Sequence, residues 1–185
     1  MTRIGAASAT ALAPGKARSA STLAIVFRVQ EAHYALRCRN IVEVIPLVAL
    51  RPVPQASPWL LGVFAYRGQL TPVIDLCGLI GGYACPKRLS SRIMLVRCTT
   101  GDGSAVVAGF LAEHVTEARR IGSDALPAGP LSAAAYLAET LLENGELLQI
   151  VDEHAILASL DNLAGVKRLL PGPETDEENR SPSQS

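Results

Sequence analysis

The sequence predicts an all-β protein with a few short helices, built as small barrels or as a sandwich. Short runs rich in Val, Ile and Leu recur along the chain, turn residues separate them, and few segments have a helical pattern. Roughly nine or ten strands are expected, which is too many for one small barrel and about right for two. Hydrophobic residues make up 49% of the chain, but only three are Phe and one is Trp, so the core should be aliphatic.

Strands are expected at residues 23–29, 34–37, 60–66, 69–74, 92–99, 104–111, 115–121, 139–142 and 146–151. Residues 40–45 are compatible with one helical turn or with the start of a strand. Four prolines between residues 46 and 58 should keep the following segment extended and irregular. Pro72 has no N–H to donate, so it should face a sheet edge or a bulge.

Turn and cap residues divide these strands. Arg67-Gly68 predicts a tight turn, and Gly101-Asp102-Gly103 predicts a hairpin turn rather than a phosphate loop, because no helix pattern follows it. Residues 132–142 have a helical composition, but Asn144-Gly145 between two apolar runs is the stronger signal and predicts a hairpin. Asp75 should cap a short helical turn at 76–80, which Gly81-Gly82 ends, and Asp152 should cap a helix at 154–163.

The two ends of the chain differ in composition from the middle. Residues 1–21 are rich in Ala, Ser and Thr, and residues 171–185 have no large apolar side chain. We therefore expect a disordered N-terminal arm at 1–21, one domain at 22–165 and a disordered C-terminal tail at 166–185. No apolar run reaches the roughly 20 residues that span a bilayer, so no direct membrane insertion is expected.

The four cysteines, Cys38, Cys77, Cys85 and Cys98, form no C-x-x-C pair, and their spacing matches no zinc ribbon or finger. The plain interpretation is free thiols that are buried or partly buried. Free thiols fit a reducing cytoplasm.

Net charge is zero, so the chain lacks the overall basic field of a nucleic-acid-binding protein. The distribution of charge is uneven. Residues 22–100 carry nine Lys and Arg against three Asp and Glu, whereas residues 101–170 carry four against ten. Either the two halves form surfaces of opposite sign, or they interleave in space and cancel.

No catalytic or metal-binding motif is found. The chain has no G-x-S-x-G elbow, and His33, His114 and His154 have no companion motif. Asp152, Glu153 and His154 are helix neighbours that point about 100° apart, so they should not converge on one ion. We therefore expect no enzyme activity, no catalytic residue, no metal and no cofactor.

Glu43 and Arg67 are both charges in largely apolar sequence surroundings, and such charges usually need a partner. One hypothesis is that they meet as a partly exposed salt bridge at a binding surface. The alternative is that they are two independent surface charges.

Several segments together resemble the CheW-like family of chemotaxis coupling proteins, from about residue 23 to 160. Residues 23–29 with 34–36 resemble the opening hairpin of that family, and residues 40–45, with Glu43 at the centre, resemble its V-x-E element. Residues 66–76 read YRGQLTPVIDL and resemble its R-G-x-x-x-P-V-I-D-L signature, which is the most specific part of the match.

The resemblance implies two packed five-stranded SH3-like barrels in a non-catalytic adaptor. The implied partners are the regulatory domain of a CheA-type histidine kinase and the cytoplasmic helical tip of a chemoreceptor (a methyl-accepting chemotaxis protein). The implied location is the cytoplasm, at receptor arrays on the inner membrane. The implied partner-binding residues are Ile41, Val42, Glu43, Gly62, Tyr66, Arg67 and Gly68.

The sequence departs from the family pattern at Ala65-Tyr66, where many members have Asn-Leu. The change removes an amide and adds an amphipathic ring beside the implied contact surface, which is compatible with a non-flagellar chemosensory pathway. The alternative function is a β-barrel module that binds nucleic acid or another protein, for which Tyr66 beside Arg67 and Tyr83 near Lys87-Arg88 are the nearest aromatic-basic pairs.

Overall fold

The computed structural model describes residues 21–99, 103, 105–122, 125–126, 134–143 and 145–161. The strands are β1 (Thr22–Val29), β2 (Ala32–Arg37), β3 (Ile41–Pro46), β4 (Leu60–Tyr66), β5 (Gln69–Asp75), β6 (Arg92–Thr99), β7 (Ala105–Ile121), β8 (Ala125–Leu126), β9 (Leu137–Glu143) and β10 (Glu146–Val151). The helices are η1 (Cys38–Asn40), α1 (Leu76–Gly81) and α2 (Glu153–Asp161). The structure is therefore mostly strands with short helices, as the sequence predicts.

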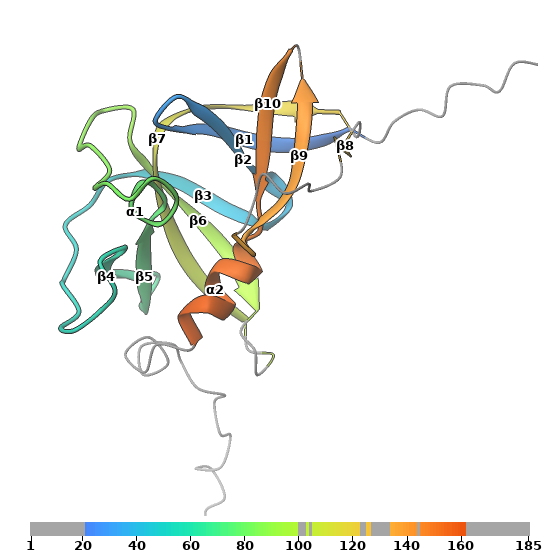
Figure 1. Ribbon diagram of the computed structural model, residues 1–185. Coiled ribbons are helices and arrows are strands. Elements are labelled where there is room, and N and C mark those ends of the chain that lie inside the picture. Colours follow the sequence, from blue (N-terminus) through green and yellow to red (C-terminus); the bar gives the residue numbers. More distant parts are fainter. Residues whose placement is uncertain are drawn as a thin grey trace, which may run out of the picture.

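The strands form two SH3-like barrels that share β7 (Figure 1). One barrel contains β3, β6, the first part of β7, β5 and β4, and the other contains the second part of β7, β1, β2, β10, β9 and β8. The first barrel is closed by a bridge between Arg51 and Val63, whose backbone groups exchange hydrogen bonds of 2.8 and 2.9 Å. In Figure 1, β7 runs from the part of the molecule around β6 to the part around β1.

Strand β7 joins the predicted strands 104–111 and 115–121 into one element. Its residues pair with β6 as far as Ala112 and with β1 from Glu113 onward. His114 has a φ of +49°, a left-handed conformation that breaks the regular strand. The chain therefore passes from one barrel to the other at residues 112–114 without a loop.

The core is aliphatic, as composition predicts, and its main cluster extends through both barrels. Phe27 of β1, Ile74 of β5, Leu95 of β6 and Ile156 of α2 belong to this cluster and are fully buried. Each such side chain contributes roughly 1.5–3 kcal/mol of burial free energy. A smaller cluster lies among β1, β2, β7, β9 and β10.

Both predicted helix caps are confirmed. The Asp75 carboxylate accepts a hydrogen bond of 3.1 Å from the Gly78 amide at the start of α1, and Gly82 ends that helix with a φ of +72°. The Asp152 carboxylate accepts from the amides of His154 and Ala155. The predicted end of the last helix, at 162–163, lies outside the described residues.

No helix of the described residues is long and apolar enough to cross a membrane.

The predicted hairpins are also present. Arg67 and Gly68 have φ values of +50° and +83°, and two consecutive positive values are typical of a type I′ turn. Strands β9 and β10 pair around Gly145, so the hairpin signal outweighs the helical composition of 132–142. For residues 40–45 the sequence allowed a helical turn or the start of a strand. The structure has both in succession, because η1 ends at Asn40 and β3 begins at Ile41.

Pairing of β5 with β7 begins only at Val73, so Pro72 precedes that ladder, as an edge position requires. The expected N-terminal arm, except residue 21, and the expected C-terminal tail lie outside the described residues.

Candidate functional site

Three side chains from β3 and from the end of β4 form a polar cluster on the surface. The Tyr66 hydroxyl donates a hydrogen bond of 2.8 Å to Glu43 Oε2. Arg67 Nη2 lies 3.9 Å from the same oxygen, and the Arg67 guanidinium carbon is 5.1 Å from the centre of the Tyr66 ring. The predicted contact between Glu43 and Arg67 is thus confirmed, and we call the three residues the Glu43–Tyr66–Arg67 cluster.

The two charged side chains of this cluster are exposed, and their ion pair has little weight in folding. The side chains of Glu43 and Arg67 are 46% and 73% exposed, and solvent screens an ion pair of that kind. The hydrogen bond to Glu43 raises the pKa of Tyr66, because the bond favours the neutral phenol. At neutral pH the phenol therefore remains a donor, while the Tyr66 ring also packs against the main core cluster.

A β-bulge positions Glu43. In the pairing of β3 with β6, Ile41 lies opposite Val96 and Glu43 lies opposite Leu95, so Val42 is an additional residue in β3. A bulge re-aims the side chains beside it. Ile41 and Val42 are half-buried and pack against the core, whereas Glu43 is exposed together with its neighbour Val44.

The two predicted site glycines have different positions. Gly68 is exposed in the turn, and a Cβ there would have no heavy atom within 4 Å. Gly62 is buried, with a φ of +147°, and a Cβ there would lie 2.4 Å from the carbonyl oxygen of Arg51. Gly62 therefore permits the close backbone approach that closes the barrel, and it offers no surface of its own to a partner.

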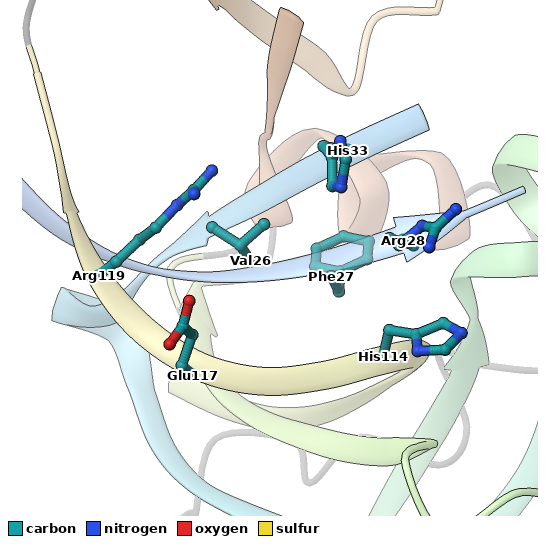
Figure 2. A pocket seen from close by; sticks show the side chains of 7 residues that line it. All are labelled: Val26, Phe27, Arg28, His33, His114, Glu117 and Arg119. Atoms are coloured by element: carbon teal, nitrogen blue, oxygen red, sulfur yellow. The ribbon is translucent and has the colours of Figure 1, made fainter. Parts of the chain in front are cut away.

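A second candidate region is a pocket of about 250 Å³ lined by residues of β1, β2 and β7. Figure 2 shows His33 on β2 and His114 on β7, on opposite sides of β1. Arg28 of the same pocket pairs with Glu31 at 2.6 Å, and His33 Nδ1 lies 3.6 Å from Glu146 Oε2. Among the described side chains, the lining includes no Ser, Thr or Cys that either histidine could activate as a nucleophile.

Asp152, Glu153 and His154 differ in their contacts. The Asp152 carboxylate caps α2, Glu153 is buried against the Asn40 side-chain amide, and His154 is exposed. His154 Nε2 lies 4.0 Å from Glu153 Oε1, so these two side chains are neighbours, whereas the Asp152 side chain is directed to the start of α2.

The cysteines are free thiols, as predicted, but two of them are neighbours in space. A hydrogen bond between the thiols of Cys77 and Cys85 lowers the pKa of Cys77 and raises that of Cys85. Asp75 lies beside both. No sequence signal points to this group, because the eight-residue spacing of Cys77 and Cys85 matches no known motif and only the return of the chain after α1 brings the thiols together.

Residues 23–161 match the CheW-like domain family. The chain is 30% identical over 123 residues to the chemotaxis protein CheW of Helicobacter pylori, which covers 66% of this chain and 67% of that protein. It is 32% identical over 145 residues to protein FrzA of Myxococcus xanthus, covering 70% and 87%. The scaffolding protein TtCheW from Thermoanaerobacter tengcongensis has a similar structure, with a TM-score of 0.64, 25% identity, and coverage of 73% of this chain and 86% of that chain.

Proposed function

The chain belongs to the CheW-like domain family and is a chemosensory coupling adaptor, and we propose that it joins a chemoreceptor to a CheA-type histidine kinase through two separate surfaces. The observation that carries the receptor surface is the Glu43–Tyr66–Arg67 cluster. Its three polar groups contact one another at an exposed position that the fold itself does not require.

The receptor surface consists of this cluster with Ile41, Val42 and the Gly68 turn around it. An acid, a phenol and a guanidinium can each bind polar groups of a receptor's helical tip, while the half-buried aliphatic side chains of β3 contact its apolar face. Gly62 acts indirectly, because it sets the position of β4 against Arg51. We place the receptor tip on this surface, where the side chains of Glu43 and Arg67 are 46% and 73% exposed.

The kinase surface is the end of a barrel, against which the regulatory domain of the kinase docks barrel to barrel. When one chain binds a receptor and a kinase together, the second binding step becomes effectively intramolecular. This raises the effective concentration of kinase at the receptor. No bond is made or broken in this mechanism, so the proposed adaptor is non-catalytic and needs no cofactor.

We propose a cytoplasmic location at receptor arrays, because both proposed contacts lie on the cytoplasmic side. A non-flagellar chemosensory pathway is the proposed output. The relatives support that choice, because they include FrzA of Myxococcus xanthus and PilI of Pseudomonas aeruginosa in addition to proteins named for chemotaxis.

A charge-reversal cycle tests the receptor surface. The variants Glu43→Lys, Arg67→Glu and the double variant are compared for binding to the cytoplasmic tip of a chemoreceptor from the same host. Each single variant should weaken binding by about tenfold, and the double variant should recover part of the loss because the two charges are coupled. Binding to the regulatory domain of the kinase should be unchanged in all three.

The controls are Glu31→Lys and Arg120→Glu, which reverse exposed charges on the other barrel. Neither should alter receptor binding. Strictly additive losses for Glu43 and Arg67, or equal losses in the controls, would remove the cluster from the receptor surface.

A further inference from the structure

Asp75, Cys77 and Cys85 come from three consecutive parts of the chain and meet in the interior. Asp75 ends β5, Cys77 lies in the first turn of α1, and Cys85 follows that helix. One carboxylate oxygen and the two sulfurs all lie within 4.8 Å of one another. The three residues are 2%, 0% and 7% exposed.

Their donor atoms suit a thiophilic divalent cation. Zn²⁺ prefers sulfur, nitrogen and carboxylate oxygen in a tetrahedral arrangement, and a Zn–S distance of about 2.3 Å places two sulfurs roughly 3.8 Å apart. Side-chain movements of about 1 Å would therefore close the three ligands around one ion. Glu113 Oε1 lies 3.8 Å from the Cys77 sulfur, but Glu113 lies outside the group of donor atoms that are all within 4.8 Å of one another, so the three residues supply three of the four tetrahedral positions.

The Asp75 carboxylate is already held in place. Its two oxygens accept hydrogen bonds of 3.1 Å from the Gly78 amide and 2.8 Å from the Cys85 amide. Each carboxylate oxygen has a second acceptor position, so these bonds leave room for a metal. Hydrogen bonds of this kind orient ligands in known metal sites.

The site also has an excess of acidic groups. Asp75 and Glu113 are both buried, and within the part of the chain that the structure describes no cation forms an ion pair with either. The Glu113 carboxylate accepts a hydrogen bond of 2.7 Å from Tyr83 instead. Buried acids are usually paired with a cation or coordinate a metal, so a divalent ion would supply what this group lacks.

A pocket leads to the site from the surface. It has a volume of about 310 Å³, and its lining includes Asp75 and Cys85, with Lys87 as a basic group and aliphatic side chains such as Leu50 and Leu61. A small ion can therefore reach the two ligands without unfolding of the barrel.

We propose that Asp75, Cys77 and Cys85 form a three-ligand binding site for a thiophilic divalent cation of the Zn²⁺ type. Binding displaces the thiol protons, because a thiolate is the form that ligates a metal. The bound ion would link the end of β5, the start of α1 and the segment that follows α1. This proposal is independent of receptor and kinase binding.

Co²⁺ provides a spectroscopic test on the full chain, purified under reducing conditions and freed of metal by a chelator. Titration of the native chain should give about one Co²⁺ per chain with thiolate-to-cobalt charge-transfer absorption, and Zn²⁺ should displace it. Cys85→Ala should lose about half of that absorption and bind Zn²⁺ at least roughly tenfold more weakly. Cys98→Ala is the matched control, since Cys98 is a buried thiol outside the site, and it should bind like the native chain.

Circular dichroism checks that each variant is folded before the titration. The proposal is overturned if the folded native chain shows no charge-transfer absorption, or if Cys85→Ala and Cys98→Ala have the same spectrum. It is also overturned if the reduced chain binds no Co²⁺ while mild oxidation links Cys77 to Cys85, since the pair would then be a dithiol redox couple.

Discussion

At the scale of single residues, the hydrogen bond between Tyr66 and Glu43 connects positions 23 residues apart. The Tyr66 hydroxyl gives Glu43 a hydrogen-bond donor. The Arg67 guanidinium lies over the same ring, so one aromatic side chain orients both charges of the cluster.

The titration of Tyr66 is predicted to depend on Glu43. The phenol donates to the carboxylate, and this bond raises the pKa of Tyr66 above its ordinary value of 10.0. Because the folded-state pKa is raised, the contribution of this bond is fully present below the pKa of the unfolded chain and is lost as the pH rises through the folded-state pKa. Glu43→Gln should lower the Tyr66 pKa, as measured by NMR titration of the tyrosine ring.

The control for this titration is Glu31→Gln, which alters an exposed acid that has no contact with Tyr66. A Tyr66 pKa that is the same in Glu43→Gln and in the native chain would contradict the observed hydrogen bond.

Gly62 and Gly68 offer a matched pair for stability. Gly62→Ala should cost at least about 3 kcal/mol of the free energy of unfolding, because the new Cβ would meet the Arg51 carbonyl oxygen in a strained backbone. Gly68→Ala should cost only about 1–2 kcal/mol, since its φ is positive but the surrounding space is open. Urea unfolding measures both, and an equal cost at the two positions would show that Gly62 does not hold β4 against Arg51.

At the scale of elements, β7 is one continuous strand where two strands, at 104–111 and 115–121, were predicted from the sequence. The chain needs no loop between the barrels because His114 adopts a left-handed conformation and the strand changes its partner from β6 to β1 at that point. An isolated left-handed residue of this kind is difficult to infer from sequence when it is not glycine.

The effect of a glycine substitution on the free energy of unfolding should therefore differ between positions of β7. His114→Gly should leave stability unchanged or increase it, because glycine adopts a positive φ without strain. Ala118→Gly, in the regular part of the strand, should reduce the free energy of unfolding by about 0.5–1 kcal/mol. Urea unfolding compares the two variants. A larger loss of unfolding free energy for His114→Gly than for Ala118→Gly would contradict the left-handed conformation at His114.

At the scale of the whole molecule, the two halves of opposite charge interleave. Strands β1 and β2, from the basic half, share a sheet with β9 and β10, from the acidic half. Arg37 pairs with Glu139 at 2.7 Å across that boundary. Opposite charges from the two halves therefore meet within this barrel, whereas β3, β4, β5 and β6 of the other barrel all come from the basic half, so the interleaving is partial.

The shared core predicts one cooperative unfolding transition. Phe27 is fully buried in the cluster that extends into both barrels, so Phe27→Ala should lower the free energy of unfolding by about 3–5 kcal/mol. Trp59 precedes β4 in the other barrel and reports on it by fluorescence, while far-UV circular dichroism reports on both barrels. The two probes should shift together in urea, and separate midpoints would show that the barrels unfold independently.

The sequence by itself determined the elements that local chemistry controls. Asp75 and Asp152 cap helices, Arg67-Gly68 forms a tight turn, and Gly145 belongs to the turn of a predicted hairpin. Each of these features depends on residues only a few positions apart. The R-G-x-x-x-P-V-I-D-L resemblance also led to the correct family and fold.

Only the tertiary structure decided which distant groups meet. The continuity of β7, the Tyr66–Glu43 hydrogen bond and the grouping of Asp75, Cys77 and Cys85 depend on strand pairing and on the path of the chain after α1. These contacts follow from packing the two barrels around a common core, and no short stretch of sequence contains that information. The same physical reason explains why Gly62, read from sequence as part of a contact surface, is a buried glycine beside the Arg51 backbone.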